Sequence, residues 1–462
     1  MAILGAVIVP HPPLIIPTVG RGREQEVQAT IDAYRTAAKQ VAAWEPEVLI
    51  ITSPHQIMYV DYFHISPGRG AAGDMSAFGT AQTKLRVEYD APLRDEIIRR
   101  AESADLSVGT LGQRNPYLDH GTFVPLYFLR EAGVDCPILR IGLSGFSPLD
   151  HYRLGQCIAR AVKDLGRRAV FVASGDLSHK LKDSGPYGFA QEGPEFDRQI
   201  TEAMAEGDFL HFLTMDPSLC DRAAECGLRS FQIMAGALDG LVMEAKLLSY
   251  EGVTGVGYGV ATFAVTGPDK NRHFGEQCVE LERARLAEKK VAEDTWVRLA
   301  RLSLETFVKT GERLERLPNG LPTEMIDQAA GTFVSLHAHG QLRGCIGTTE
   351  PTTENVAWEI VQNAVSACSR DPRFPPVTVS ELDSLEYSVD VLGQPEPISS
   401  PAELDVKKYG VIVSCGGRRG LLLPDLEGVD MVEQQIDIAR QKGGISSREK
   451  YTLERFEVVR HL

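Results

Sequence analysis

Four histidines in the first half of the chain follow short apolar runs, or the loops after them: His11, His55, His120 and His179. Apolar runs of this length predict buried strands, and α/β folds place their chemistry at the ends of strands. A neutral imidazole can bind a divalent metal, and it exchanges protons near neutral pH. One such histidine would be an ordinary surface or core residue, but four in similar positions predict a metal or acid/base site.

The run before His179 is the clearest of these positions. Val170–Ala173 is apolar and predicts a buried strand, and Ser174-Gly175-Asp176 supplies turn and capping residues directly after it. Asp176, three residues before His179, could orient an imidazole or bind a metal itself.

The residue types suit a single metal ion. His11 and His55 supply two imidazoles, and Glu225, or Cys226 beside it, could complete a facial set. Two histidines and one carboxylate leave open positions for substrate and oxygen, as in non-haem Fe(II) oxygenases. His120 and His179 then remain for acid/base work.

A βαβ unit is predicted to position the first two histidines. Residues 2–9 and 47–52 predict strands, and residues 23–44 have helical periodicity. This spacing suits parallel pairing, which brings His11 and His55 to the same edge of one sheet. Residues 66–80 are rich in Gly and Ala and predict a loop. Further helices and strands alternate as far as residue 265, which predicts an α/β domain with a mainly parallel central sheet.

Composition limits the class of protein. The 462 residues carry a formal net charge of −15 and are 43% hydrophobic. These values predict a globular protein and argue against a general nucleic-acid binder, which usually carries a basic face. No apolar run approaches the roughly 18 residues of a membrane span. The eight cysteines show no CxxC pair, and the first residues lack the basic region of a signal peptide. A cytoplasmic enzyme without disulfides is therefore expected.

The second half predicts a smaller domain. Residues 266–272 are small, polar and broken by proline, as in a linker, and a long charged helix is expected over residues 280–310. Short strands and two helices follow, with His339 in a turn. The predicted organisation is an α/β domain over residues 1–268 and an α+β domain over residues 280–462.

Cys345 lies between glycines in the most distinctive run of this second half, Leu342-Arg-Gly-Cys-Ile-Gly347. A structural bend with a buried thiol explains such a run adequately. The alternative is a site in which Cys345 is a nucleophile or metal ligand. Arg343 could bind an anion there, and His337 would lie nearby on the paired strand.

Four short motifs resemble the class III extradiol dioxygenase superfamily, which includes the catalytic subunit of protocatechuate dioxygenases and the Memo proteins. They are Pro10-His-Pro-Pro13, Ser53-Pro-His55, Asp119-His-Gly121 and Ser174-Gly-Asp-Leu-Ser-His179. The resemblance covers about residues 1–265. It implies that His11 and His55 bind the metal, that His179 is the acid/base group of ring cleavage, and that His120 is a second active-site histidine.

The resemblance leaves two candidates for the third ligand. Ring-cleaving members present a glutamate there, whereas Memo proteins present a cysteine followed by glycine. This chain has Glu225-Cys226-Gly227, which contains both. Register favours Cys226, and the chemistry of a facial triad favours Glu225, which we take as the expected ligand. Fe(II) is the expected metal, with Cu, Zn or Mn as alternatives.

The second half resembles the AMMECR-type domain over about residues 285–462. The matching runs are Arg343-Gly-Cys-Ile-Gly347, Asp371-Pro-Arg-Phe-Pro-Pro376 and Gly420-Leu-Leu-Leu-Pro424. Proteins of these two types occur with a radical-SAM protein in a three-part set called AmmeMemoRadiSam. This chain lacks the CxxxCxxC motif of the radical-SAM part, so that part would be a separate partner.

Three functions follow from these observations. The first is a metal-dependent enzyme of extradiol type that acts on a small aromatic or heteroaromatic compound. The second is a Memo-like protein that binds metal without turnover. The third is an O2-independent modification enzyme that works with a radical-SAM partner. None of the three functions involves nucleic acid or a membrane as a partner. The sequence does not determine the oligomeric state, and a homo-oligomer is possible.

Overall fold

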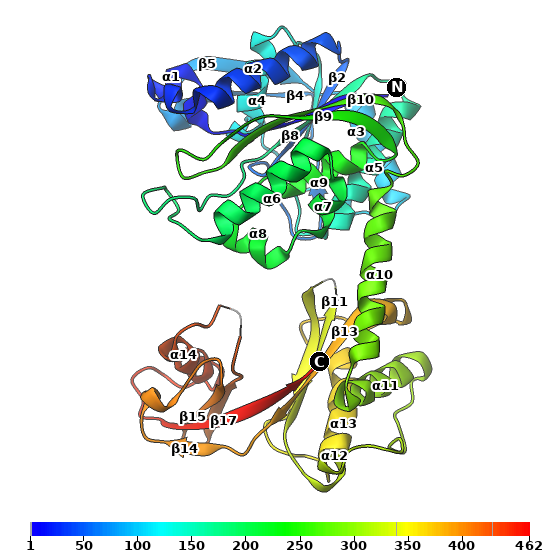
Figure 1. Cartoon of the computed structure of the whole chain (residues 1–462), viewed down its shortest axis with the longest axis vertical. Coiled ribbons are helices and arrows are strands. Elements are labelled where there is room, and N and C mark those ends of the chain that lie inside the picture. Colours follow the sequence, from blue (N-terminus) through cyan, green and yellow to red (C-terminus); the bar gives the residue numbers. More distant parts are fainter. Residues whose placement is uncertain (1, 339, 427) are drawn as a thin grey trace. The chain divides into compact units, whose positions relative to one another are not determined.

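The first unit is built on a six-stranded sheet with helices on both faces (Figure 1). The computed structural model describes residues 2–338, 340–426 and 428–462. The chain divides into two units, Met1–Leu281 and Glu282–Leu462. The strands of the first sheet are β1 (Ile3–Val9), β2 (Val48–Ser53), β7 (Ile138–Gly142), β8 (Ala169–Ser174), β9 (Leu241–Glu251) and β10 (Tyr258–Pro268).

The spatial order of these strands is β7-β2-β8-β1-β10-β9. The first four are parallel, whereas β10 runs antiparallel to both β1 and β9. The expectation of a mainly parallel sheet is therefore wrong, and the sheet is mixed. The reason is the short connection between β9 and β10, because consecutive strands joined by a tight turn pair antiparallel, whereas a parallel pair needs a long crossover.

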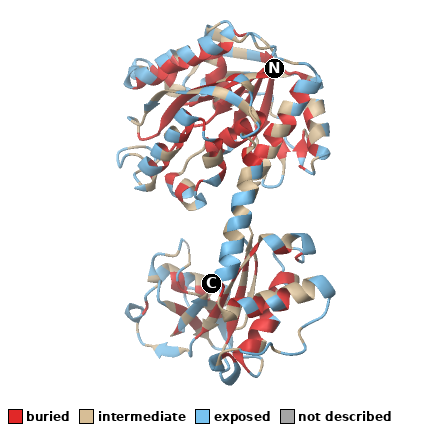
Figure 2. Ribbon diagram, turned by 45° about the vertical axis from the view of Figure 1, so that its right-hand side comes forward, coloured by how far each residue is buried: buried red, intermediate tan, exposed pale blue. Residues whose placement is uncertain are grey.

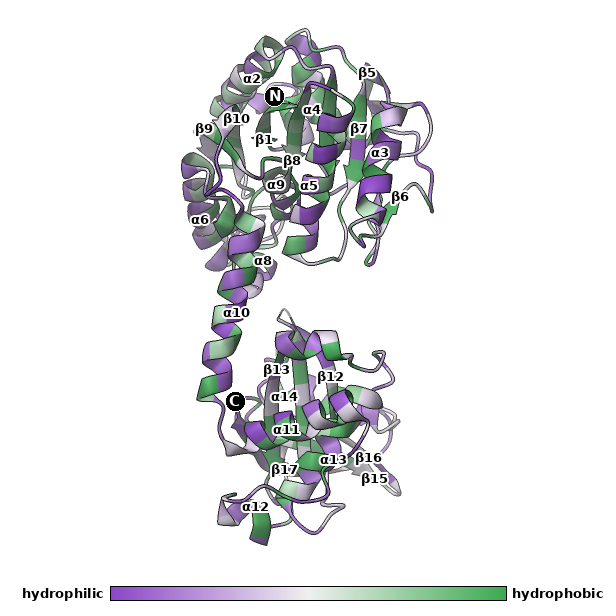
Figure 3. Cartoon of the chain, turned by 90° about the vertical axis from the view of Figure 1, so that its right-hand side faces the viewer, coloured by the Kyte–Doolittle hydropathy of each residue, from purple (hydrophilic) through white to green (hydrophobic). Residues whose placement is uncertain are grey.

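Two layers of helices bury the sheet. Helices α2 and α4 pack on one face, and α5 and α9 pack on the other with α3, α6 and α7 beside them. The parallel strands are buried on both faces (Figure 2), and β1 and β8 are correspondingly hydrophobic (Figure 3). The helices of this unit are α1 (Pro17–Gly20), α2 (Gln28–Ala43), α3 (Ala91–Glu102), α4 (His120–Glu131), α5 (Pro148–Asp164), α6 (Glu192–Glu206), α7 (Phe209–Thr214), α8 (Pro217–Ala223) and α9 (Leu228–Ala237). Helix α10 (Phe274–Ala292) begins in this unit and ends in the second.

Two small ribbons lie outside the central sheet. Strands β3 (Phe63–His64) and β6 (Val108–Gly109) pair in parallel, and β4 (Gly70–Met75) pairs antiparallel with β5 (Thr80–Glu88). The second ribbon replaces the loop expected over residues 66–80. Its glycines hid the strand signal, but they are needed because a Cβ on Gly70 would lie 2.2 Å from the Val87 carbonyl oxygen.

The second unit is a curled antiparallel sheet with helices, which confirms the α+β expectation. Strand β17 joins its two halves, because it pairs with β13 near its end and with β14 and β15 near its start. The strands are β11 (Thr332–Ala338), β12 (Gln341–Gly347), β13 (Leu385–Leu392), β14 (Glu396–Ile398), β15 (Tyr409–Cys415), β16 (Arg418–Leu422) and β17 (Thr452–His461). The helices are α11 (Thr295–Thr310), α12 (Thr323–Asp327), α13 (Val356–Ser369) and α14 (Val432–Lys442).

The single helix expected over residues 280–310 is two helices, α10 and α11. Asp294 separates them, since its carboxylate accepts from the Val297 N–H at 3.1 Å and caps α11. The turn expected at His339 lies outside the described residues. Within the described parts of the chain, no helix has both the length and the apolar character needed to cross a membrane.

Candidate metal centre

Three of the predicted histidines converge at the carboxyl edge of the parallel strands. One ring nitrogen each from His11, His55 and His120 lies within 4.8 Å of the others. His11 follows β1 and His55 follows β2, and both strands are parallel to β8, which lies between them. The two Nε2 atoms are 3.0 Å apart. This is the convergence that the βαβ argument predicts.

His120 reaches the cluster from a helix and not from a strand end. It is the first residue of α4, and its ring contacts that of His55 with 3.8 Å between centroids and 34° between the ring planes. Asp119 caps this helix by accepting from the Thr122 N–H at 2.9 Å. The sequence contained this signal, because an aspartate ahead of an apolar helical run is a favoured N-cap.

Asp119 also ties the cluster together. Its Oδ1 accepts from the Ser53 hydroxyl at 2.6 Å, and the Ser53 Oγ accepts from the His55 backbone N–H at 3.2 Å. The fully buried Arg140 lies 3.8 Å from the other carboxylate oxygen. One carboxylate therefore fixes the start of α4 and the end of β2, which carry two of the three histidines.

The cluster holds its imidazoles neutral. Burial, followed by the charge of neighbouring His55, lowers the pKa of His11 to about 3. Burial and the same neighbour lower the pKa of His120 to about 3, and burial also lowers the pKa of His55. Neutral imidazoles have the free lone pairs that metal binding requires. His11 is buried whereas His55 is exposed, so the site is open to solvent on the His55 side.

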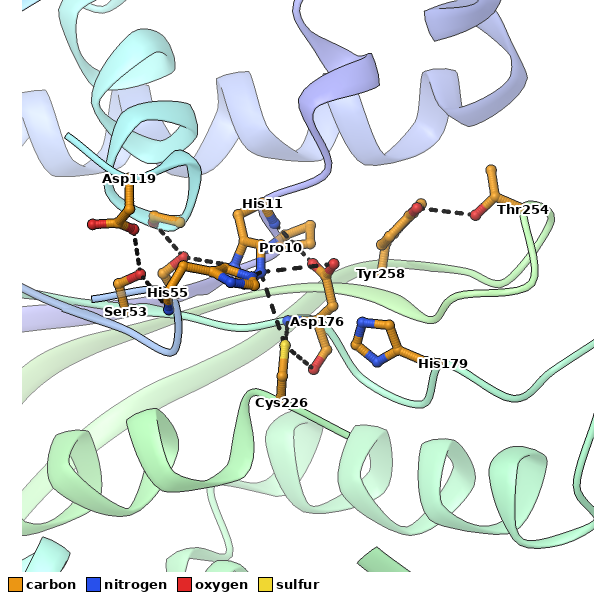
Figure 4. Close-up of polar contacts among 12 residues, drawn as sticks. Pro10, His11, Ser53, His55, Asp119, Asp176, His179, Cys226, Thr254 and Tyr258 are labelled. Atoms are coloured by element: carbon orange, nitrogen blue, oxygen red, sulfur yellow. Dashed lines mark hydrogen bonds and ion pairs between the residues drawn. The ribbon is translucent and has the colours of Figure 1, made fainter. Parts of the chain in front are cut away.

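Asp176 and Cys226 adjoin the cluster (Figure 4). Asp176 Oδ2 and Cys226 Sγ each lie 3.8 Å from His11 Nε2. Asp176 Oδ1 also accepts from the His11 backbone N–H at 2.8 Å. Burial raises the pKa of Asp176 to about 6, and burial with the nearby Asp176 charge raises the pKa of the Cys226 thiol.

Glu225 does not lie with the histidines. Its Oε2 accepts from the Leu228 N–H at 2.7 Å, at the start of α9, and burial raises its pKa to about 7. Both residues lie in the bend between α8 and α9, which turns Cys226 toward His11 and Glu225 toward the start of α9. Asp176 and Cys226, and not Glu225, therefore contact the His11 ring.

His179 lies on the other side of Asp176 from His55 in Figure 4. Its Nδ1 is 2.7 Å from the Ala224 carbonyl oxygen. A carbonyl only accepts, so Nδ1 carries a hydrogen, and in a neutral ring the lone pair is on Nε2. The loop before His179 is held by buried Asp197, which accepts from the Ser178 N–H at 2.8 Å.

Two aromatic rings that the sequence argument missed contact the site histidines. Phe78, between β4 and β5, meets the His120 ring edge-on with centroids 5.3 Å apart. Tyr187 meets the His179 ring in the same way at 5.0 Å. Phe78 is 39% exposed and Tyr187 59%. Neither sequence neighbourhood marks a site, because both contacts depend on how surface segments fold over the sheet edge.

In the second unit, the structure joins two of the predicted motif runs around Cys345. The Cys345 N–H donates to Asp371 at 2.9 Å, and Arg373 donates to the Cys345 carbonyl at 3.2 Å. The Cys345 sulfur accepts from the Ser335 hydroxyl at 3.2 Å. The Arg343 guanidinium, which was expected to bind an anion, donates to the Glu381 carboxylate at 2.7 Å. It is therefore already paired within the chain.

His337 is not the residue opposite Cys345. In the register of β11 and β12, Ser335 pairs with Cys345 and His337 pairs with Leu342. Burial lowers the pKa of His337. The bonds of Cys345 and Arg343 hold the edge of the sheet together, and no hydrogen bond between His337 and Cys345 is seen in the described part of this unit.

Known proteins match both units. Residues 5–261 match the catalytic LigB subunit of aromatic ring-opening dioxygenase, and residues 297–461 match AMMECR1. Protein CA_C1420 of Clostridium acetobutylicum is 40% identical over 100% of this chain and 99% of its own length. A Thermotoga maritima protein is 47% identical over 36% of this chain and 99% of its own. The crystal structure of PH0010 from Pyrococcus horikoshii covers 36% of this chain and 88% of its own, with 32% identity and a TM-score of 0.34.

Proposed function

Because the chain belongs to the family of the catalytic LigB subunit of aromatic ring-opening dioxygenases and carries an AMMECR1 domain, we propose that its first unit is a metal-dependent enzyme of extradiol type. Its substrate is a small aromatic or heteroaromatic compound, and its metal is Fe(II). The observation that carries the proposal is the group of three neutral imidazoles, two of them with Nε2 atoms 3.0 Å apart.

The residues present fit a metal ion. His11 Nε2 and His55 Nε2 are the first two ligand atoms, and His120 lies within reach as a further imidazole. Asp176 Oδ2 or Cys226 Sγ, each 3.8 Å from His11 Nε2, replaces the expected Glu225 as the next ligand. With two histidines and a carboxylate, bound Fe(II) would supply open positions for adjacent substrate oxygens and for O2.

His179 supplies the proton chemistry. Its Nδ1–H is held by the Ala224 carbonyl, so Nε2 is free to take a proton from a substrate hydroxyl and to return it later. Asp197 keeps the loop before His179 in place through the Ser178 N–H. The neutral His120 ring can donate or accept one hydrogen bond to a bound oxygen, but with a pKa of about 3 it holds no positive charge at neutral pH.

Binding of 4-nitrocatechol to the anaerobic full-length chain tests this function. We expect one Fe(II) per chain and a visible absorption change when the catechol binds, followed by O2 consumption with a cleavable catechol. His11→Ala should abolish both iron and the absorption change. Failure of the iron-loaded wild type to bind any catechol would contradict the extradiol proposal.

A second function is favoured by the position of Cys226. A thiol 3.8 Å from His11 Nε2 suits a Memo-like metal site, and it would be oxidised easily beside an O2-activating centre. The alternative function is metal binding without O2 turnover, in work with a separate radical-SAM protein. Metal content separates the two: loss with Asp176→Asn supports the carboxylate site, whereas loss with Cys226→Ala supports the thiolate site. Glu225→Gln, which leaves both groups in place, is the matched control and should retain metal.

A further inference from the structure

Helix α4 contains a proline that leaves one carbonyl without its usual donor. In an α-helix, the N–H of each residue donates to the carbonyl four residues earlier, and proline has no N–H. Pro125 lies inside α4. The carbonyl of Gly121, four residues before it, therefore lacks its helical partner.

The Ser174 hydroxyl takes the place of that donor. Ser174 is fully buried at the end of β8, and its Oγ donates to the Gly121 carbonyl oxygen at 2.6 Å. The same Oγ lies 3.0 Å from His11 Nδ1. A hydroxyl has one hydrogen to donate. Since Gly121 receives it, Ser174 can only accept the hydrogen bond with His11.

This direction determines which His11 nitrogen carries a hydrogen. A neutral imidazole has one N–H, and an accepting Ser174 Oγ requires it on Nδ1. Nε2 is then unprotonated, and Nε2 is the atom 3.0 Å from His55 Nε2. Metal-bound histidines usually have a carbonyl or carboxylate behind the ring, which can only accept. A serine hydroxyl can donate or accept, so a second hydrogen bond must determine that Ser174 accepts from His11.

We propose that Pro125 is a positioning residue for the metal centre: by leaving the Gly121 carbonyl free, it commits the Ser174 hydrogen and so keeps His11 Nε2 unprotonated. The inference rests on the proposed function in naming a metal as the partner of Nε2. The tautomer itself is a property of the metal-free chain, so the two can be tested separately.

Pro125→Ala is the informative variant. It supplies an N–H for the Gly121 carbonyl and releases the Ser174 hydrogen, which can then point at His11 Nδ1. Alanine is the better helix former, so the variant should fold with an unchanged or higher melting temperature. We expect the nitrogen-15 spectrum of the metal-free chain to show His11 as a mixture of tautomers, with the signal assigned by its loss in His11→Gln. Zn(II), used as the probe metal, should bind about tenfold more weakly.

Two further variants show whether the effect passes through Ser174. Ser174→Ala should weaken Zn(II) binding by a similar factor, and adding Pro125→Ala to it should cause no further loss. Thr52→Val is the matched control, because Thr52 is a fully buried hydroxyl on neighbouring β2 that has no hydrogen-bond partner in the described structure. It should leave both His11 and Zn(II) affinity unchanged.

The inference is overturned if Pro125→Ala leaves the His11 tautomer as in wild type, or if it weakens Zn(II) binding equally with and without Ser174. If the wild type binds no metal, the proposed function fails, and the His11 spectrum of Pro125→Ala still decides this inference.

Discussion

Replacing Asp119 by alanine should loosen the metal centre and destabilise the first unit together. Asp119 accepts from the Ser53 hydroxyl, from the Thr122 N–H and from the Thr122 hydroxyl. It is also the carboxylate 3.8 Å from the fully buried guanidinium of Arg140. The alanine variant removes all of these acceptors at once.

The cost can be estimated from these bonds. Loss of an N-cap acceptor costs about 1 kcal/mol. A hydrogen bond to a charged acceptor contributes about 1.5 to 3 kcal/mol, and the Ser53 bond is of this kind. Because bonds to one carboxylate are not additive, we expect Asp119→Ala to lower the free energy of unfolding by about 3 kcal/mol. The displaced ends of β2 and α4 should weaken Zn(II) binding about 10- to 100-fold.

Asp119→Asn is the control that separates shape from charge. Asparagine is an equally good N-cap and keeps the oxygen that accepts from Ser53 and from the Thr122 N–H. It removes the negative charge facing Arg140 and the acceptor of the Thr122 hydroxyl, so we expect a loss of about 1 kcal/mol and a smaller decrease in metal affinity.

Urea unfolding followed by Trp44 fluorescence measures the stability of the first unit. Trp296 and Trp358 of the second unit are replaced by phenylalanine, so that the signal reports one unit. Zn(II) titration by calorimetry gives the affinity. The reasoning is refuted if Asp119→Ala unfolds within 1 kcal/mol of wild type, or if it is destabilised as expected but binds Zn(II) with wild-type affinity.

Three other predictions follow from the described contacts. Phe78→Leu and Tyr187→Leu remove rings that contact site histidines, so each should weaken 4-nitrocatechol binding about three- to tenfold but leave oxalate binding unchanged; equal losses for both ligands would contradict an aromatic-recognition role. Burial raises the pKa of Asp197 to about 7, so the folded chain holds a proton that the unfolded chain releases above about pH 4. The free energy of unfolding should therefore fall by on the order of 3 kcal/mol as pH rises from 4 to 7, and urea curves of Asp197→Asn should lack this fall. Asp371→Ala removes the acceptor of the Cys345 N–H, so it should destabilise the second unit by about 2 kcal/mol and speed iodoacetamide labelling of Cys345, measured by mass spectrometry; an unchanged labelling rate would contradict that contact.

Much of the fold could be read from periodicity. The strands that become β1, β2 and β8 are apolar runs because the sheet is buried on both faces, and this pattern is local. Strand β4 could not be read in this way, because its two glycines allow close backbone approaches and its residues carry no alternating pattern. The antiparallel pairing of β9 with β10 was readable from their short connection, but the place of β10 beside β1 was not, since the apolar pattern of a buried strand does not depend on its partner.

Some residues of the candidate site could likewise be placed from the sequence, and others could not. His11 and His55 could be placed together from sequence because parallel strands bring their carboxyl ends to one edge. Glu225 and Cys226 could not be told apart, since they are adjacent and both are metal-ligand types. Their difference is one of direction, and the turn into α9 decides it.

The sequence by itself determined the two-part organisation, the residue types of the candidate metal centre and the strand ends that carry two of its histidines. These depend on local pattern and on the geometry of a βαβ unit. Only the tertiary structure decided that Asp176 and Cys226 adjoin His11, that Phe78 and Tyr187 meet the site histidines, and that Pro125, Gly121, Ser174 and His11 form one hydrogen-bond chain. Such contacts join residues far apart in sequence, and a single hydrogen or the direction of one side chain sets their chemistry.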